Sequence, residues 1–172
     1  MISMRIKIHT DQQGAREVRK EVIGNATLYA DSLARKNSEA LSFIPKPRLE
    51  QYAANGQLMI AIENGEPCGF LLHGNGWPVM RIYQSCIQYD ARRREHGFKL
   101  IALLIGKAAQ HGYEAICLKC AADLEANAFW REAGFRFIRA IPGGTRRGRT
   151  LNVWYMPLPL IENAQRQGRL IA

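Results

Sequence analysis

The chain has 172 residues, 47% of them hydrophobic, and a formal net charge of +9 at neutral pH. This length and apolar content suit a single globular core. No apolar run is long enough to cross a membrane, and the first residues lack the basic, apolar and small-residue order of a secretory signal, so a cytoplasmic protein is expected.

The first third of the chain predicts a strand followed by helices. Residues 5–9 alternate charged and apolar side chains, which is typical of a strand. Residues 15–33 have the apolar spacing of one or two amphipathic helices, and a break is expected near Gly24-Asn25. After a loop that contains two prolines, residues 47–54 predict a short helix that Asn55-Gly56 ends.

A hairpin is the next predicted element. Residues 58–63 and 67–73 are apolar runs on either side of Asn64-Gly65, a pair that is typical of a two-residue β-turn. His73 closes the second run beside a glycine-rich segment, where a histidine is expected to lie in solvent.

The second half of the chain alternates strand and helix patterns. Strands are predicted over residues 79–89 and 114–119, helices over 97–110 and 124–132, and a closing hairpin over 135–141 and 151–156 with 143–148 at its tip. This order predicts an α/β architecture, a mixed sheet with helices on both faces. We expect one domain over residues 1–158 and a polar tail over residues 159–172.

The segment between the 79–89 strand and the 97–110 helix reads Arg92-Arg93-Arg94-Glu95-His96-Gly97. The first N–H groups of a helix have no partner within the helix, and the helix dipole is positive at that end. Basic side chains are unfavourable there unless an anion is bound. Glycine lets a phosphate approach the backbone, and arginine binds it through paired hydrogen bonds. The segment therefore predicts a phosphate-binding site.

This segment resembles the pyrophosphate loop of the GNAT N-acyltransferases, whose pattern is Arg/Gln-x-x-Gly-x-Gly/Ala between a strand and a long helix. On this chain Arg92 takes the first position, Glu95 replaces the first glycine and Gly97 takes the place of the second. Glu95 departs from the family pattern, because it brings a negative charge near the expected pyrophosphate. A register that begins at Arg94 and ends at Lys99 is the alternative.

A second stretch, residues 123–135, resembles the family's Asn-x-x-Ala-x-x-Phe-Tyr-x-x-x-Gly-Phe helix and turn. Counting back from Gly134-Phe135 puts Asp123 on the family asparagine and Trp130 on the family tyrosine. That tyrosine often protonates the departing CoA thiolate. The indole of Trp130 cannot do so, because it only donates a hydrogen bond and does not ionise usefully.

The resemblance implies acetyl-CoA as the cofactor and a GNAT-like, mostly antiparallel sheet that splays open between its fourth and fifth strands. The pantetheine arm of the cofactor would pair with the backbone of the fourth strand. Asn127 is equally suited to an exposed helix position, and Trp130 to the core. The implied cofactor-binding residues are Cys86, Ile87, Gln88, Arg92, Arg93, Arg94, Glu95, His96, Gly97, Phe98, Lys99, Asn127 and Trp130.

Direct acetyl transfer to an amine needs a group that takes a proton from the acceptor. The family often uses a glutamate of the fourth strand, where this chain offers Gln84. Gln84, Asp123 and Tyr155 are therefore the catalytic candidates. Asp123 is also suited to cap the helix that follows it, and Tyr155 to pack within the closing strand.

Cysteine spacing argues against a metal site. Cys117 and Cys120 have no second Cys or His pair at zinc spacing, and a strand would point them to opposite faces. Reduced, buried thiols and no bound metal are expected.

Three functions stay open from the sequence. The first is an N-acetyltransferase that uses acetyl-CoA and a primary amine of a small molecule or protein. The second is nucleic-acid modification, as in phage-type proteins that resemble this family, with Arg146, Arg147 and Arg149 of the basic hairpin tip on the phosphate backbone. The third is a non-catalytic binding module. A homodimer is compatible with each of them.

Overall fold

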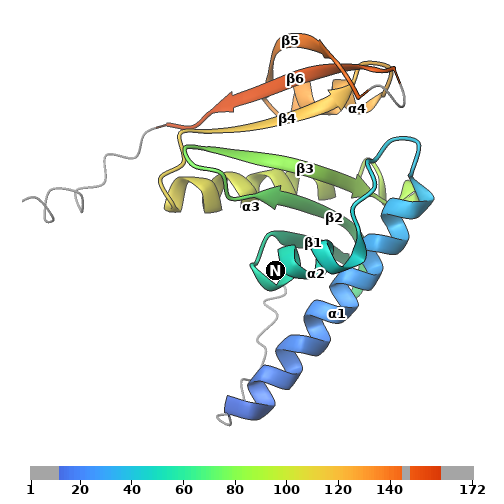
Figure 1. Ribbon diagram of the computed structural model, residues 1–172, viewed down its shortest axis with the longest axis vertical. Coiled ribbons are helices and arrows are strands. Elements are labelled where there is room, and N and C mark those ends of the chain that lie inside the picture. The colour runs from blue at the N-terminus through green and yellow to red at the C-terminus, as the bar shows by residue number, and fades with distance from the viewer. Residues whose placement is uncertain (1–11, 145–147, 160–172) are drawn as a thin grey trace, which may run out of the picture.

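Four α-helices and six strands make up residues 12–144 and 148–159, the part of the chain that the computed structural model describes (Figure 1). The predicted order of elements is confirmed, apart from the strand expected at residues 5–9, which lies outside the described residues. In chain order the elements are α1 (Gln12–Lys36), α2 (Lys46–Ala54), β1 (Leu58–Glu63), β2 (Glu66–Gly74), β3 (Val79–Ile87), a 3-10 turn (Tyr89–Ala91), α3 (His96–Gln110), β4 (Ala115–Ala121), α4 (Ala126–Glu132), β5 (Arg136–Pro142) and β6 (Thr150–Pro157).

The six strands form one sheet in the order β1-β2-β3-β4-β6-β5. Only β3 and β4 run parallel, because α3 carries the chain from the end of β3 back to the start of β4. All other neighbours are antiparallel. The first hairpin turns at Asn64 and Gly65, which both have positive φ angles, as the predicted turn requires. The predicted mixed, mostly antiparallel sheet is thus confirmed.

Helix α1 is a single helix, and the break expected near Gly24-Asn25 is absent. A glycine inside a helix costs about 1 kcal/mol relative to alanine, which tertiary packing readily offsets. Here the following turns of α1 bury Thr27, Ala30 and Leu33, and the last two belong to a cluster with α2 and β2. The local sequence signal was therefore overruled by burial of the helix face.

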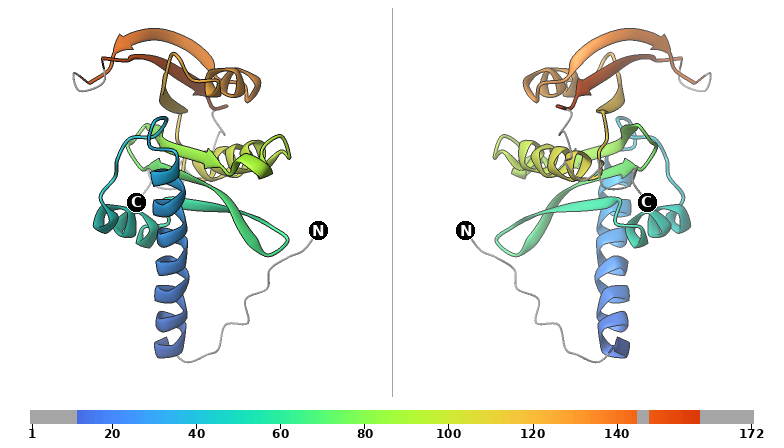
Figure 2. Two further views of the ribbon diagram at one scale, coloured as in Figure 1. Left: turned by 90° about the vertical axis from the view of Figure 1, so that its right-hand side faces the viewer. Right: turned by 90° about the vertical axis from the view of Figure 1, so that its left-hand side faces the viewer.

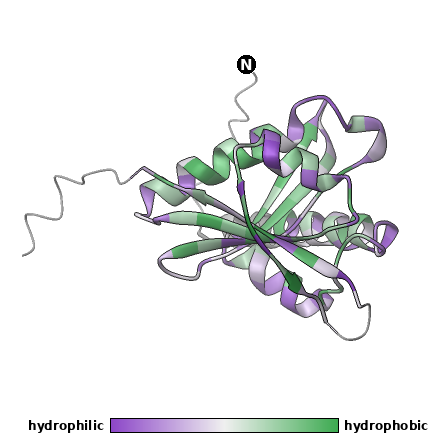
Figure 3. Cartoon of the chain, turned by 90° about the horizontal axis from the view of Figure 1, so that it is seen from above, coloured by the Kyte–Doolittle hydropathy of each residue, from purple (hydrophilic) through white to green (hydrophobic). Residues whose placement is uncertain are grey.

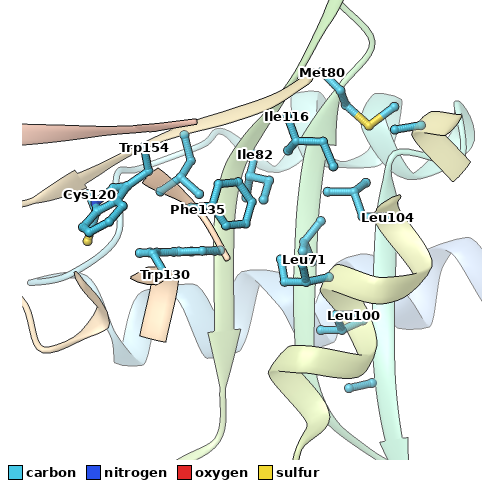
Figure 4. Close-up of a cluster of buried hydrophobic side chains, with 14 of the residues drawn as sticks. Leu71, Met80, Ile82, Leu100, Leu104, Ile116, Cys120, Trp130, Phe135 and Trp154 are labelled. Atoms are coloured by element: carbon cyan, nitrogen blue, oxygen red, sulfur yellow. The ribbon is translucent and has the colours of Figure 1, made fainter. Parts of the chain in front are cut away.

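Helices cover the sheet from both sides, as predicted (Figure 2). On one side, here called the α1 face, α1 and α2 enclose Phe70, Leu72 and Cys86 of β2 and β3. On the other side, the α3 face, α3 packs on β1–β4 and α4 packs on β4 and β5. Leu71 and Leu104 are fully buried in the α3-face core (Figure 4). Apolar positions gather in the strands at the centre of the molecule, and polar positions in the connecting turns (Figure 3).

The sheet opens between β3 and β4 because β3 carries a bulge. Leu72 lies opposite Gln84 and His73 opposite Ile82, so Tyr83 has no partner residue on β2. A bulge bends a strand and increases its twist. Ile82 is also the last residue of β3 that pairs with β4. Beyond it the two strands diverge, which confirms the predicted splay; β3 and β4 correspond to the predicted fourth and fifth strands (Figure 1).

Candidate functional site

The turn between β3 and α3 has two residues with left-handed backbone, Arg93 (φ 63°) and Glu95 (φ 64°). Glu95 is the residue that immediately precedes α3. A left-handed conformation costs an ordinary side chain about 1–2 kcal/mol and is open to glycine, which explains why a glycine is expected here. Gly97 instead lies inside the helix, without a positive φ. The backbone therefore favours the register that begins at Arg92.

The first turn of α3 presents N–H groups without helical acceptors. The first bond of the helix runs from Lys99 N to Glu95 O at 2.9 Å, so the N–H groups of His96, Gly97 and Phe98 are left over. No side chain of the described residues caps them. The Glu95 carboxylate lies 3.8 Å from Lys99 Nζ, one turn further along the surface. Three adjacent N–H groups are therefore positioned to receive an anion.

The arginines of this turn are partly held by the protein itself. Arg92 donates through Nε to Ile87 O at 3.2 Å, and its guanidinium lies 5.4 Å from the centre of the Tyr89 ring. Arg94 donates through Nη1 to Glu63 Oε2 at 2.8 Å. Arg93 is exposed on the turn between them. The turn is thus shaped by side-chain contacts as well as by its backbone.

Glu63, the last residue of β1, was missed by the sequence analysis. Its carboxylate accepts from Arg94 and lies 3.2 Å from His96 Nε2. The hydrogen bond to His96, and then the charge of Arg94, hold the pKa of Glu63 below its ordinary value. Glu63 therefore ties both sides of the turn between β3 and α3 to β1. No motif marks this residue, because the contact joins positions 31 and 33 residues apart.

Gly97 allows α3 to approach α4 closely. A Cβ atom at this position would lie 3.0 Å from two atoms of the Phe129 ring. The rings of Phe98 and Phe129 are also in contact, with their centres 5.0 Å apart. Helix packing alone would thus select glycine at this position, whether or not a phosphate is bound.

The edge of β3 that faces the opening is unpaired beyond Ile82 within the described chain. On the opposite edge β3 pairs with β2 as far as Ile87, and Gln88 N donates to Cys68 O at 2.9 Å. The Cys86 side chain belongs to the α1-face core, and burial raises its thiol pKa. Cys86 and Ile87 therefore present backbone, not side chains, to the opening.

Asn127 and Trp130 of α4 lie in structural contacts. Asn127 Nδ2 donates to Ala121 O at 2.8 Å and Leu124 O at 2.7 Å, while its Oδ1 accepts from Trp154 Nε1 at 3.0 Å. Trp130 is 6% exposed and packs edge-on against Phe135 (Figure 4). Both side chains thus fix α4 against β4 and β6, on the α3 face.

The three catalytic candidates lie in different surroundings. Gln84 is 4% exposed, and its amide donates to Ser42 O of the segment between α1 and α2. Asp123 does not cap α4, which begins three residues later after Glu125, so that expectation was wrong. Its carboxylate instead accepts from Arg149 Nη2 at 2.8 Å. Tyr155 is half-buried on the α1 face, opposite Cys117 of β4.

Of the three arginines of the basic hairpin tip, Arg149 lies within the described residues. It donates to Asp123 and also to Glu39 O, which follows α1. Arg146 and Arg147 lie outside the described residues. Arg149 therefore ties the β5–β6 hairpin to the segment between α1 and α2, across the open end of the sheet.

A shallow hollow of about 270 Å³ lies on the α1 face beside the bulge. The exposed Tyr83 ring forms one wall and contacts Tyr52 of α2, with ring centres 5.6 Å apart. The other lining residues are Ser42, Phe43, Ile44, Pro45 and Arg48. The hollow is thus aromatic and adjoins the closed end of the opening.

His73 is fully buried, and the expectation that it lies in solvent was wrong. Its Nδ1 lies 3.3 Å from Gly74 O and its Nε2 lies 3.2 Å from Lys107 Nζ. Desolvation, and then the charge of Lys107, lower the pKa of His73. Lys107 also donates to Gly56 O. This cluster joins α3 to the segment before β1, away from the turn between β3 and α3.

Residues 12–144 and 148–159 contain no group of three or more His, Cys, Asp or Glu side chains that could hold a metal ion. The four cysteines are free thiols. None of the described helices has the length and apolar character needed to cross a bilayer.

Comparisons with known proteins agree with this geometry. The sequence matches the Acetyltransferase (GNAT) family over residues 26–135. No curated protein matches the chain.

Three solved structures of the same fold, among others, share 13–15% identity with this chain. Ard1 from Thermoplasma volcanium superposes with a TM-score of 0.69 at 14% identity, over 78% of this chain and 92% of its own. The ribosomal-protein-S18-alanine N-acetyltransferase from Escherichia coli gives 0.60 at 15%, over 81% and 90%. An aminoglycoside 6′-N-acetyltransferase complexed with coenzyme A gives 0.62 at 13%, over 76% and 89%.

Proposed function

Because the chain belongs to the acetyltransferase (GNAT) family, we propose that it transfers the acetyl group of acetyl-CoA to a primary amine of a small molecule or protein. The observation that carries this proposal is the start of α3. Three N–H groups without helical acceptors lie at the end of β3, where the sheet opens. Family membership makes acetyl-CoA the cofactor, and its thioester supplies the acetyl group.

The turn before α3 suits the diphosphate of this cofactor, and the unpaired edge of β3 suits its pantetheine arm. The N–H groups of His96, Gly97 and Phe98 would hold the diphosphate, with Arg93 on the exposed side. The unpaired edge of β3 from Tyr83 to Ile87 would hydrogen-bond the pantetheine arm as a neighbouring strand does. A backbone N–H of this edge is also suited to donate to the thioester carbonyl oxygen during transfer.

The acceptor would reach the opening from the α1 face, because α3 and α4 cover the opposite face. Gln84 has an amide that cannot take a proton, and its N–H already serves Ser42 O. Asp123 would need to part from Arg149 before it could act as a base. Tyr155 is the remaining candidate, as a hydroxyl that passes a proton near the closed end of the opening.

Calorimetry with CoA tests the cofactor site. The double variant Arg92→Glu, Arg94→Glu should bind CoA more weakly, because it replaces two cations of the turn with anions next to the expected diphosphate. Glu95→Gly should bind it more tightly, since the change removes a negative charge and frees the left-handed backbone.

Arg131→Glu is the matched control, because Arg131 is an exposed cation of α4. Thermal unfolding of each variant checks that the fold persists. Equal CoA affinity in the double variant and in the control would refute the assignment of the turn. CoA binding without acetylation of any amine would instead favour a non-catalytic binding module.

A further inference from the structure

The β4–β6–β5 half of the sheet lacks a covering helix on its α1 face. The apolar cluster under α1 and α2 takes its strand residues from β1, β2 and β3. The ribbon shows α1 and α2 beside these strands and away from β5 and β6 (Figure 2). Without a covering helix, side chains of β4 reach solvent although β4 is a central strand: Lys119 is exposed and Cys117 is only half-buried. Tyr155 of β6, opposite Cys117, is half-buried as well. This face is therefore open to solvent in the described chain.

The open face and the adjoining start of β3 carry four cations, from strands β3, β4 and β5. Strand pairing fixes their side, because Ile82, Leu118 and Trp154 lie in the α3-face core and their sequence neighbours alternate. We call Arg81, Lys119, Arg136 and Arg139 the cationic face; all four are exposed.

No carboxylate of the same strands balances this charge. Strands β4, β5 and β6 contain neither aspartate nor glutamate. Like charges on neighbouring strands repel and are unfavourable without a counter-ion. An open sheet face with cations alone therefore attracts anions and repels polycations.

The size of the cationic face suits a short extended chain. Neighbouring strands lie about 4.8 Å apart, so the backbones of Lys119 and Arg139, two strands apart, are about 10 Å from each other. Arg81 and Arg136 are separated by three such steps, or about 14 Å. These spans match three to four residues of an extended peptide, at about 3.3 Å per residue.

The cationic face adjoins the opening where an acceptor would enter. Lys119 directly follows Leu118, the last residue of β4 that pairs with β3. Beyond this point β4 also has an edge that no described strand covers. The aromatic hollow beside Tyr83 lies across the closed end from it. The free edge of β4 offers main-chain N–H and C=O groups, and an extended peptide presents both matching acceptors and donors, whereas a sugar–phosphate backbone has no N–H donor.

We propose that the acceptor is an acidic peptide, whose free amino group enters the opening while aspartate or glutamate residues next to it bind the cationic face. This inference rests on the proposed acetyl transfer and names the class of its substrate. Arginine guanidinium groups bind carboxylates through paired hydrogen bonds, which suits Arg136 and Arg139 on the outer strand.

Acetylation kinetics with three peptides tests the proposal. The peptides have equal length and the same first residue with a free amino group, followed by acidic, glutamine or lysine residues at positions two to five. The kcat/KM for the acidic peptide should exceed that for the glutamine peptide about tenfold at low salt, with the lysine peptide lowest. The preference should shrink in high salt, where exposed charges are screened.

Lys119→Gln combined with Arg139→Gln should raise KM for the acidic peptide about threefold to tenfold, as expected for two exposed ion pairs. The KM for the glutamine peptide and the affinity for CoA should not change. Arg131→Gln, on the exposed surface of α4, is the control and should leave the preference intact.

Equal rates for the three peptides on the unaltered protein would overturn the proposal without any variant. The proposal would also be overturned if a single-stranded oligonucleotide inhibited acetylation of the glutamine peptide more strongly than the acidic peptide does. If the peptides are not acetylated although CoA binds, this inference fails and the cofactor site stands. If CoA does not bind either, the proposed function itself fails.

Discussion

The two halves of the split sheet are built differently. Strands β1–β3 are covered on both faces, by α1 and α2 on one side and by α3 on the other. Strands β4, β6 and β5 are covered on the α3 face only, where α4 and Trp154 complete the core. The first half buries Leu71 and Leu72 on opposite faces, whereas the second exposes Lys119 and Arg139 on its open face.

This difference affects which half of the sheet can carry polar side chains for binding. A strand buried on both faces needs apolar side chains throughout, which leaves little room for specific chemistry. A strand with one open face needs apolar side chains at alternate positions only, so the other positions are free to carry charge. The opening lies at the boundary between the two halves, so under the proposed function the half that contains the turn before α3 would bind the cofactor and the open face of the other half would select the acceptor.

The largest expected effect compares leucine removal in the two halves. Leu72→Ala should lower the free energy of unfolding by about 2–5 kcal/mol, because Leu72 is fully buried between β2 and α1. Leu151→Ala, on the open face of β6, should cost about 1 kcal/mol, since that side chain is already half in solvent. Urea unfolding measures both; equal losses would contradict the comparison.

A smaller effect tests how the halves meet through α3 and α4. Gly97→Ala should destabilise the protein by about 1–3 kcal/mol, because the new Cβ would press on Phe129 of α4. Gly106→Ala is the matched control in the same helix, where a Cβ meets no atom within 4 Å. That change should stabilise by about 0.5–1 kcal/mol, as alanine does inside helices. Thermal unfolding would contradict this view if Gly97→Ala and Gly106→Ala both raised, or both lowered, the melting temperature.

The smallest expected effect is the pH dependence of stability that comes from buried His73, which contacts Lys107 in the covered half. The folded state keeps His73 neutral, with its pKa below the ordinary 6.5. Below that pH the unfolded chain binds the proton more readily, so the free energy of unfolding should fall as the pH drops, by at most about 1.4 kcal/mol per unit. Above pH 6.5 this contribution is fully present.

Replacing His73 with glutamine should flatten the dependence, because an amide does not titrate in this range. His111→Gln, at the exposed end of α3, is the control. Urea unfolding between pH 5 and pH 8 gives the slope of the unfolding free energy against pH for each variant. An unchanged slope in the His73 variant would assign the acid sensitivity to other groups.

Sequence patterns predicted most of the elements because their signals are local. The Asn64-Gly65 turn, the apolar spacing of α3 and the closing hairpin each depend on a few neighbouring residues. The turn before α3 was also located from the sequence, since basic residues at a helix start are a local conflict, and its role in phosphate binding stays a prediction. The break in α1 was predicted wrongly, because burial outweighed the cost of one glycine.

Contacts between distant positions could not be predicted in the same way. Glu63 meets Arg94 and His96 only after β1 and α3 pack together. Asp123, a catalytic candidate that was also expected to cap α4, instead pairs with Arg149 of the β5–β6 hairpin. Tyr83 becomes a bulge only through its register against β2. Each of these pairings depends on topology, which single-residue preferences do not encode.

The amino-acid sequence alone determined the order of elements, the basic turn before α3 and the absence of carboxylates in β4, β5 and β6, because these are properties of contiguous residues. The tertiary structure alone decided that the cations of those strands share one uncovered face beside the opening. The physical reason is that strand register and the reach of α1 and α2 set which side chains meet water. Neither is fixed until the sheet has assembled.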